Sequence, residues 1–269
     1  NAWSWQLTAF DIDGKATTKA STDHCALVAG SNASDVMNDG PGGVDNSFGK
    51  NVAPIFAALD SAFFETSDQA IVSGGDTVAF LPLSPGSAPS SFPIALFQAN
   101  GANIANPDTW KAHASEVSSV SPLLVGAKFP AATKVGAAFT SGVTGDVVHL
   151  PLGRGGMTMR LDVHGARMTL TYAPDGTTKG VLGGWLETAA FTAEFKKLAG
   201  AISSGFCSGS ALQGVTEQLE QASDILSDGT QAPEKTCNAI TIGIGITTRP
   251  GTVDGVFTPA PATDPCAAE

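Results

Sequence analysis

The fold is most clearly indicated by residues 157–172, which read Met-Thr-Met-Arg-Leu-Asp-Val-His-Gly-Ala-Arg-Met-Thr-Leu-Thr-Tyr. Apolar and polar residues alternate on both sides of His164-Gly165. The apolar positions are Met157, Met159, Leu161, Val163, Ala166, Met168, Leu170 and Tyr172. A period of two is typical of a β-strand with one buried face. Two such runs around a short glycine-containing turn predict a β-hairpin that reverses at His164-Gly165.

Similar short runs surround this stretch and are separated by turn-forming residues. The further predicted strands are residues 3–9, 70–73, 77–83, 92–98, 123–129, 135–140, 146–152, 181–187 and 239–246. Apolar residues at helical spacing predict helices over residues 51–64, 188–202 and 211–226. Many short strands with frequent turns indicate a mainly-β fold, which we expect to be a jelly-roll-like β-sandwich with three attached helices.

We expect one domain over residues 1–269, because the sequence contains neither an internal repeat nor a clear linker. Residues 14–50 form a long polar N-terminal loop in this interpretation, and residues 188–228 form a helical pair. Residues 250–269 form a proline-rich C-terminal strap.

The composition excludes several classes of protein. Hydrophobic residues make up 42% of the chain and include 14 Phe, which is enough to build a core and argues against disorder. The net charge is -11, so the basic surface that a general nucleic-acid binder needs is missing. The sequence also lacks an uninterrupted apolar run of about 18 residues, so we predict no transmembrane segment.

The four cysteines, Cys25, Cys207, Cys237 and Cys266, are scattered and form no C-x-x-C pair. The spacing therefore does not indicate a zinc site. We predict instead two disulfides that form in an oxidising compartment. Three pairings are possible, and we favour Cys207–Cys237, which brackets a predicted helix, together with Cys25–Cys266. The alternative is four buried thiols in a cytosolic protein. Because the chain starts at Asn1 rather than at Met, we expect that an export signal preceded it.

One polar stretch has the composition of a calcium loop. The first 46 residues hold six Asp and no Glu, and glycines accompany them over residues 38–46. Calcium prefers six to eight oxygen ligands, and glycines allow backbone carbonyls to join carboxylates around the ion. The predicted ligands are Asp11, Asp13, Asp39, Asp45 and Asn46, with Asp39 and Asp45 the strongest candidates. The EF-hand spacing is not met, and a set of Asx turns with a helix N-cap is the alternative.

No catalytic motif is present, since the sequence lacks HExxH, a G-x-S-x-G elbow and a P-loop. Arg160 and Arg167 share the polar face of the predicted hairpin with Asp162, which indicates a salt-bridged outer face or, alternatively, a contact for an anion or glycan. Trp110 lies in a predicted loop, from which it could stack on a sugar ring.

Several segments resemble a group of uncharacterised secreted proteins and lipoproteins of myxobacteria and related bacteria. They are residues 7–14 (LTAFDIDG), 43–49 (GVDNSFG), 221–225 (QASDI), 228–230 (DGT), 242–245 (IGIG) and 264–266 (DPC). The resemblance implies export, with an outer-membrane lipid anchor upstream of Asn1 as a further implication, and it supplies no activity.

These observations favour an exported, disulfide-stapled, calcium-supported protein that binds a ligand or takes part in surface assembly without catalysing a reaction. Its expected location is the outer-membrane surface, the periplasm or the extracellular space. A glycan or protein partner at the cell surface, or a homo-oligomer or larger assembly, fits this interpretation. The alternative is an extracellular hydrolase that acts on a polymer through a spatially assembled site.

Overall fold

The computed structural model describes residues 6–7, 24–33, 46–72, 76–82, 92–100, 109–116, 127–154, 157–248, 250–258 and 264–267. Its strands are β1 (Gln6–Leu7), β2 (Asp76–Pro82), β3 (Phe92–Asn100), β4 (Thr109–His113), β5 (Ala127–Val135), β6 (Ala138–Thr140), β7 (Val148–Arg154), β8 (Met157–Tyr172), β9 (Thr178–Glu187), β10 (Ala239–Thr248) and β11 (Thr252–Phe257). Its α-helices are α2 (Ala53–Leu59), α3 (Phe63–Val72), α4 (Thr188–Ile202) and α5 (Ser210–Gln221). Short helical turns are η1 (Phe48–Val52), η2 (Ala114–Glu116) and η3 (Ser204–Phe206).

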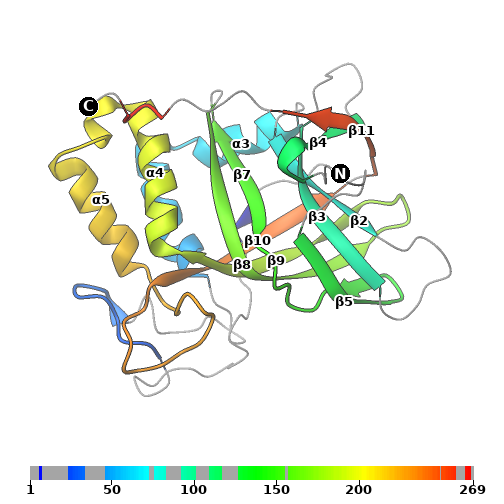
Figure 1. Ribbon diagram of the computed structural model, residues 1–269, viewed down its shortest axis with the longest axis horizontal. Coiled ribbons are helices and arrows are strands. Elements are labelled where there is room, and N and C mark those ends of the chain that lie inside the picture. Colours follow the sequence, from blue (N-terminus) through cyan, green and yellow to red (C-terminus); the bar gives the residue numbers. More distant parts are fainter. Residues whose placement is uncertain are drawn as a thin grey trace.

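The described strands form one hydrogen-bonded sheet in the order β1-β10-β9-β8-β6-β5-β3-β4-β11, with β7 also paired to β8 and β2 to β3. All of these pairs are antiparallel except β4 with β11, which is parallel. Figure 1 shows α4 and α5 together at one end of the molecule, while β2, β3 and β5 lie at the other. The prediction of a mainly-β fold with attached helices is therefore confirmed. A sandwich of two separate sheets is not seen in the described residues.

The predicted hairpin at His164-Gly165 is wrong, because β8 runs straight through this point as a single long strand. Its neighbour β9 pairs with both halves, matching Val163 with Leu186 and Met168 with Leu182. The register shifts between His164 and Arg167, where Gly165 has a φ of +55°. Such a β-bulge uses the same left-handed glycine as a hairpin turn, so the local sequence is compatible with both. Because β9 is continuous and pairs with both halves of β8, the chain forms a bulge here and not a hairpin turn.

Trp185 of β9 fills the space beside this bulge. A Cβ atom built on Gly165 would collide with the six-membered ring of Trp185, and so would one on Gly229 in the loop after α5. The indole Nε1 donates a hydrogen bond to the Ser227 carbonyl oxygen at 3.0 Å. Trp185 thus packs between the bulge and the 227–230 loop, and both glycines are required by its ring.

The core lies between the sheet and the helices. Leu161, Val163 and Met168 of β8 point into it, as the alternating pattern predicts. Phenylalanines from η1, α2, α3 and α4 form a connected aromatic cluster with ring centroids 4.8–6.4 Å apart. Its members are Phe48, Phe56, Phe63, Phe64, Phe191 and Phe195. This cluster joins the helical segments to one another, and it belongs to the same buried core as the apolar residues of the sheet.

The helix predictions are correct for α4, whose bounds match, and approximate elsewhere. The single helix expected over 51–64 is divided into η1, α2 and the start of α3. The strand predicted over 70–73 is wrong, because residues 70–72 belong to α3. A short apolar run such as Ala70-Ile71-Val72 fits either state, and here the helix that begins at Phe63 continues through it.

Candidate functional site

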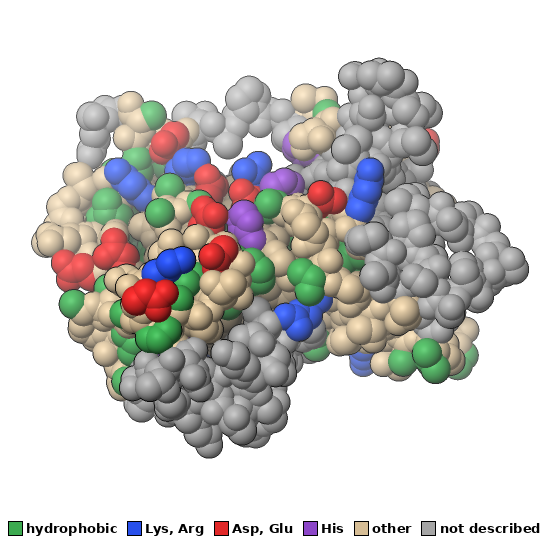
Figure 2. All heavy atoms as spheres, turned by 60° about the horizontal axis from the view of Figure 1, so that its bottom comes forward, with side chains coloured by type: hydrophobic (Ala, Val, Ile, Leu, Met, Phe, Trp, Pro, Cys, Tyr) green, Lys and Arg blue, Asp and Glu red, His purple; other side chains and the backbone are tan. Residues whose placement is uncertain are grey.

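A charged groove lies where the polar face of β8 meets the start of α4. It has a volume of about 410 Å³. Its polar lining comprises Arg160, Asp162, His164, Glu187 and Glu194. Leu161, Leu186 and Phe191 contribute the apolar part of the wall. Figure 2 shows acidic, basic and histidine side chains intermixed on the face that it displays.

The alternation of β8 places Arg160, Asp162 and His164 on one side of the strand, opposite the core residues. The antiparallel register sets His149 of β7 directly across from Asp162. Facing residues on neighbouring strands have side chains close enough to interact. Strand pairing therefore brings together a histidine and a carboxylate that are 13 positions apart.

Asp162 accepts hydrogen bonds from both His149 and Arg160, and the three residues form a triad. His149 Nδ1 lies 2.7 Å from Asp162 Oδ1. Arg160 donates from Nε to Oδ1 at 2.8 Å and from Nη2 to Oδ2 at 3.0 Å, which is the two-pronged geometry that guanidinium and carboxylate groups favour. The predicted salt-bridged outer face is thus confirmed for Arg160 and Asp162. The partnership with His149 was not predicted, because it depends on strand register.

The triad holds Asp162 in its ionised form. Burial raises the pKa of Asp162, but hydrogen bonds from His149 and Arg160, with the positive charge of Arg160, outweigh burial and lower it below the ordinary value. An ionised carboxylate only accepts hydrogen bonds, so Nδ1 of His149 carries the proton in this pair. In the neutral ring, Nε2 then keeps its lone pair.

A second polar cluster surrounds the end of α5 and the start of β10, and it is buried. Asp224 is 5% exposed, and its carboxylate accepts hydrogen bonds from the backbone N–H of Thr241 at 2.7 Å and from the Thr241 hydroxyl. Thr241 Oγ1 in turn accepts the Ser47 N–H at 3.0 Å, and the Ser47 hydroxyl donates to the Ala222 carbonyl oxygen. This Asp224 junction joins η1, α5 and β10 in the interior.

Asn46, one of the predicted calcium ligands, takes part in the same region. Its Oδ1 accepts the N–H groups of Gly49 at 2.8 Å and Gly243 at 3.2 Å, while Nδ2 donates to the Gly243 carbonyl oxygen at 3.3 Å. The side chain therefore holds the start of η1 against β10, in the manner of the Asx turn that was the alternative to an ion ligand. The other predicted ligands, Asp11, Asp13, Asp39 and Asp45, lie outside the described residues, so the calcium site stays a prediction.

All four cysteines form disulfides, as predicted, but the favoured pairing is wrong. Cys25 bonds to Cys237 and Cys207 to Cys266, with Cα atoms 5.2 Å and 5.1 Å apart. Helix α5 separates Cys207 from Cys237 in sequence, and the two cysteines bond instead to Cys266 and Cys25, which lie towards opposite ends of the sequence. The Cys207–Cys266 disulfide holds the C-terminal segment against α4, since the sulfurs of both cysteines lie beside Gly200.

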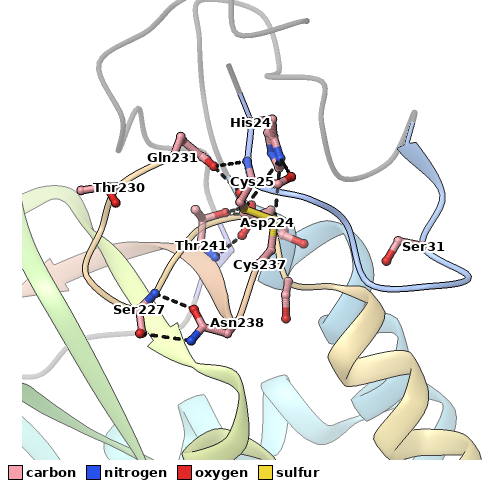
Figure 3. The surroundings of a disulfide bond; sticks show 12 residues. His24, Cys25, Ser31, Asp224, Ser227, Thr230, Gln231, Cys237, Asn238 and Thr241 are labelled. Atoms are coloured by element: carbon pink, nitrogen blue, oxygen red, sulfur yellow. Dashed lines mark hydrogen bonds between the residues drawn. A yellow bond between two sulfur atoms is a disulfide. The ribbon is translucent and has the colours of Figure 1, made fainter. Parts of the chain in front are cut away.

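The Cys25–Cys237 disulfide lies next to a buried histidine (Figure 3). Nδ1 of His24 is 3.9 Å from Cys25 Sγ and 3.8 Å from Cys237 Sγ. Within the described part of the chain, this is the one cluster of at least three histidine, cysteine or acidic side chains whose ligand atoms converge within 4.8 Å. No sequence motif indicates this cluster, because 213 positions separate His24 from Cys237.

Trp110 is placed differently from its prediction. It belongs to β4, which was not predicted as a strand, and its side chain is 1% exposed. A ring buried to this degree has no free face on which a sugar could stack. The groove at β8 is therefore the better candidate for ligand contact.

No protein-family model, curated protein or solved structure matches this chain. The resemblance to secreted myxobacterial proteins therefore remains a prediction. In the described residues, no helix combines the length and the hydrophobicity that crossing a bilayer requires.

Proposed function

We propose that the protein is an exported, disulfide-stapled binding protein whose ligand site is the groove between β8 and α4. The observation that carries this proposal is the triad of His149, Asp162 and Arg160, of which Asp162 and Arg160 line the groove. Its hydrogen bonds hold the polar groups in place before a ligand arrives, which lowers the entropy cost of binding. The two disulfides support export, because such bonds persist mainly in oxidising compartments.

The lining favours a hydroxyl-rich ligand such as a glycan. Carboxylate, guanidinium and imidazole groups supply both hydrogen-bond donors and acceptors, and an apolar wall with Phe191 provides contact for a sugar's C–H face. The lining carboxylates of Asp162, Glu187 and Glu194 face two cations, Arg160 beside Asp162 and Lys197 at 2.5 Å from Glu194, so one negative charge is in excess. Their excess negative charge favours neutral or amino sugars over acidic ones.

Isothermal titration calorimetry with three soluble probes tests the proposal: glucosamine oligomers, neutral glucose oligomers and galacturonic acid oligomers. We expect binding of the first two and weaker or absent binding of the acidic probe. Asp162→Asn should reduce affinity by about tenfold, since a hydrogen bond to a charged group contributes about 1.5–3 kcal/mol. Glu217→Gln, on the exposed surface of α5, is the matched control and should leave affinity unchanged.

Binding of none of these probes would contradict a glycan site. So would equal affinities for the Asp162→Asn and Glu217→Gln variants, because the groove would then play no part in the interaction.

The alternative function is hydrolysis, which the 2.7 Å contact between His149 and Asp162 supports, because a carboxylate-oriented histidine can act as a general base. The lowered pKa of Asp162 argues against this residue as the proton donor of a glycosidase, since that role needs a carboxylic acid with a raised pKa. Release of reducing ends from the same oligomers, lost in His149→Gln, would establish hydrolysis over simple binding.

Two further parts of the proposal rest on sequence. The acidic N-terminal loop is proposed to hold calcium, in which case chelation lowers the melting temperature. Binding to another protein in a surface assembly is proposed as the alternative to binding a glycan.

A further inference from the structure

The Cys25–Cys237 disulfide and His24 have the composition of a soft-metal site. His24 is 4% exposed, and each of the two cysteines is 2% exposed. The histidine nitrogen lies 3.8–3.9 Å from both sulfurs. Tetrahedral zinc has Zn–S distances of about 2.3 Å and Zn–N distances of about 2.0–2.1 Å, which separate neighbouring ligand atoms by roughly 3.6 Å. The nitrogen is therefore already placed close to its position in such a site.

The backbone that carries these residues is held together by contacts other than the disulfide. Ala26 donates its N–H to the Lys235 carbonyl oxygen, and Cys237 donates to the Ala26 carbonyl oxygen, both at 2.8 Å. Gln231 accepts the Cys25 N–H through Oε1 at 2.9 Å and donates through Nε2 to the Asp224 carbonyl oxygen at 2.9 Å. Figure 3 shows Gln231 beside Cys25 and the two bonded sulfurs. None of these four hydrogen bonds uses a sulfur atom, so none of them requires the disulfide to be formed.

We infer that reduction of the Cys25–Cys237 disulfide converts this cluster into a binding site for a thiophilic divalent cation such as Zn²⁺. A dithiol reductant supplies two electrons and two protons, is itself oxidised to a disulfide, and leaves Cys25 and Cys237 as thiols. Binding of Zn²⁺ then releases both thiol protons. Two thiolates neutralise the charge of the ion, so the buried site carries no net charge.

His24 completes the ligand set through a change of tautomer. Nδ1 now lies 3.0 Å from the Cys25 carbonyl oxygen, which only accepts hydrogen bonds, so Nδ1 carries the proton. On metal binding the proton moves to Nε2 and the Nδ1 lone pair faces the ion. Cys237 also lines a pocket of about 530 Å³, from which a water molecule can supply the fourth ligand. The reduced protein thus has the zinc site, and the oxidised protein does not.

The test uses the full chain with Cys207→Ser and Cys266→Ser, so that one disulfide remains. Reduction with a phosphine, which becomes a phosphine oxide and binds zinc weakly, avoids competition from added thiols. Zinc is then titrated against a chromogenic chelator, and Co²⁺ absorption reports thiolate coordination. We expect one Zn²⁺ per reduced chain and none per oxidised chain, with a higher melting temperature for the reduced protein in zinc.

His24→Ala should weaken zinc binding by at least about tenfold, since loss of even an outer hydrogen-bond partner of a metal ligand has this effect. His113→Ala, at the end of β4 and away from both the groove and the disulfide, is the matched control and should bind zinc as the parent does. Circular dichroism follows the fold in the same samples. Equal affinities for His24→Ala and the parent, no zinc uptake after reduction, or loss of the fold on reduction would each overturn the inference.

Discussion

Asp162 and Asp224 show how one side chain serves two purposes in this molecule. Asp162 sits at the groove with a side chain that is 30% exposed, and its partners Arg160 and His149 reach it from β8 and β7. Asp224 is buried, and the Thr241 hydroxyl and N–H donate to its carboxylate. The first aspartate orders groups that a ligand can meet, whereas the second is buried and joins η1, α5 and β10.

The difference teaches that exposure, rather than residue type, separates the candidate ligand site from the structural junction. A half-exposed ion pair contributes little to stability because water screens it. A buried carboxylate is costly to remove, since its partners lose their acceptor in a place that water does not reach. Trp185 lies between the two regions, packing against Gly165 on the groove strand and Gly229 in the loop after Asp224.

The largest effect is expected from Asp224→Ala. It leaves the N–H and hydroxyl of Thr241 without their acceptor in the interior, so the free energy of unfolding should fall by about 4 kcal/mol. Urea denaturation measures this loss. Asp162→Ala is the comparison and should lose about 1 kcal/mol. Equal losses for the two variants would remove the distinction between junction and groove.

Gly165→Ala should have the next largest effect, because the added methyl group displaces Trp185, which packs between the groove strand and the loop after Asp224. The added methyl group collides with the indole and also holds an alanine at a φ of +55°, for an expected loss of about 3 kcal/mol. Gly136→Ala is the matched control, since Gly136 has a φ of +59° with open space around its Cβ position. It should lose about 1 kcal/mol, from backbone strain alone.

A loss for Gly165→Ala no larger than that for Gly136→Ala would mean that Trp185 does not fill the space beside the bulge. Near-ultraviolet circular dichroism of the tryptophans provides an independent readout, which we expect to change in the first variant alone.

The smallest effect is the pH dependence of the groove. The folded-state pKa of Asp162 is lowered, so its contribution to stability is complete above the unfolded value of about 3.9 and is lost as the pH falls through the folded pKa. Asp162→Asn should therefore be less stable than the parent by about 1 kcal/mol at pH 7, and the two should converge below about pH 4. Paired urea titrations across this range measure the difference. A constant difference down to pH 2 would contradict the ionised triad.

Much of the local structure could be predicted from the sequence. Alternation along residues 157–172 identified the buried and polar faces of β8, and helical spacing identified α4 at its observed bounds. These patterns are local, because the periods of strands and helices express which face is buried. The same alternation placed Arg160 and Asp162 on one face, and so found part of the candidate site.

The remaining parts depend on contacts between distant residues. The sequence around Gly165 permits a hairpin or a bulge, and β9 decides between them by pairing with both halves of β8. His149 meets Asp162 through the register of β7. Four scattered cysteines indicated two disulfides, but the choice among three pairings required the folded chain.

The sequence by itself determined a mainly-β chain with helices, four oxidised cysteines and a charged strand face, because each depends on composition or on short-range periodicity. Only the tertiary structure decided that β8 continues through a bulge, which cysteines pair, and that His24 lies beside Cys25 and Cys237. The reason is physical: the register of β9 sets the bulge, and the disulfides join residues 212 and 59 positions apart, so no local pattern encodes these contacts.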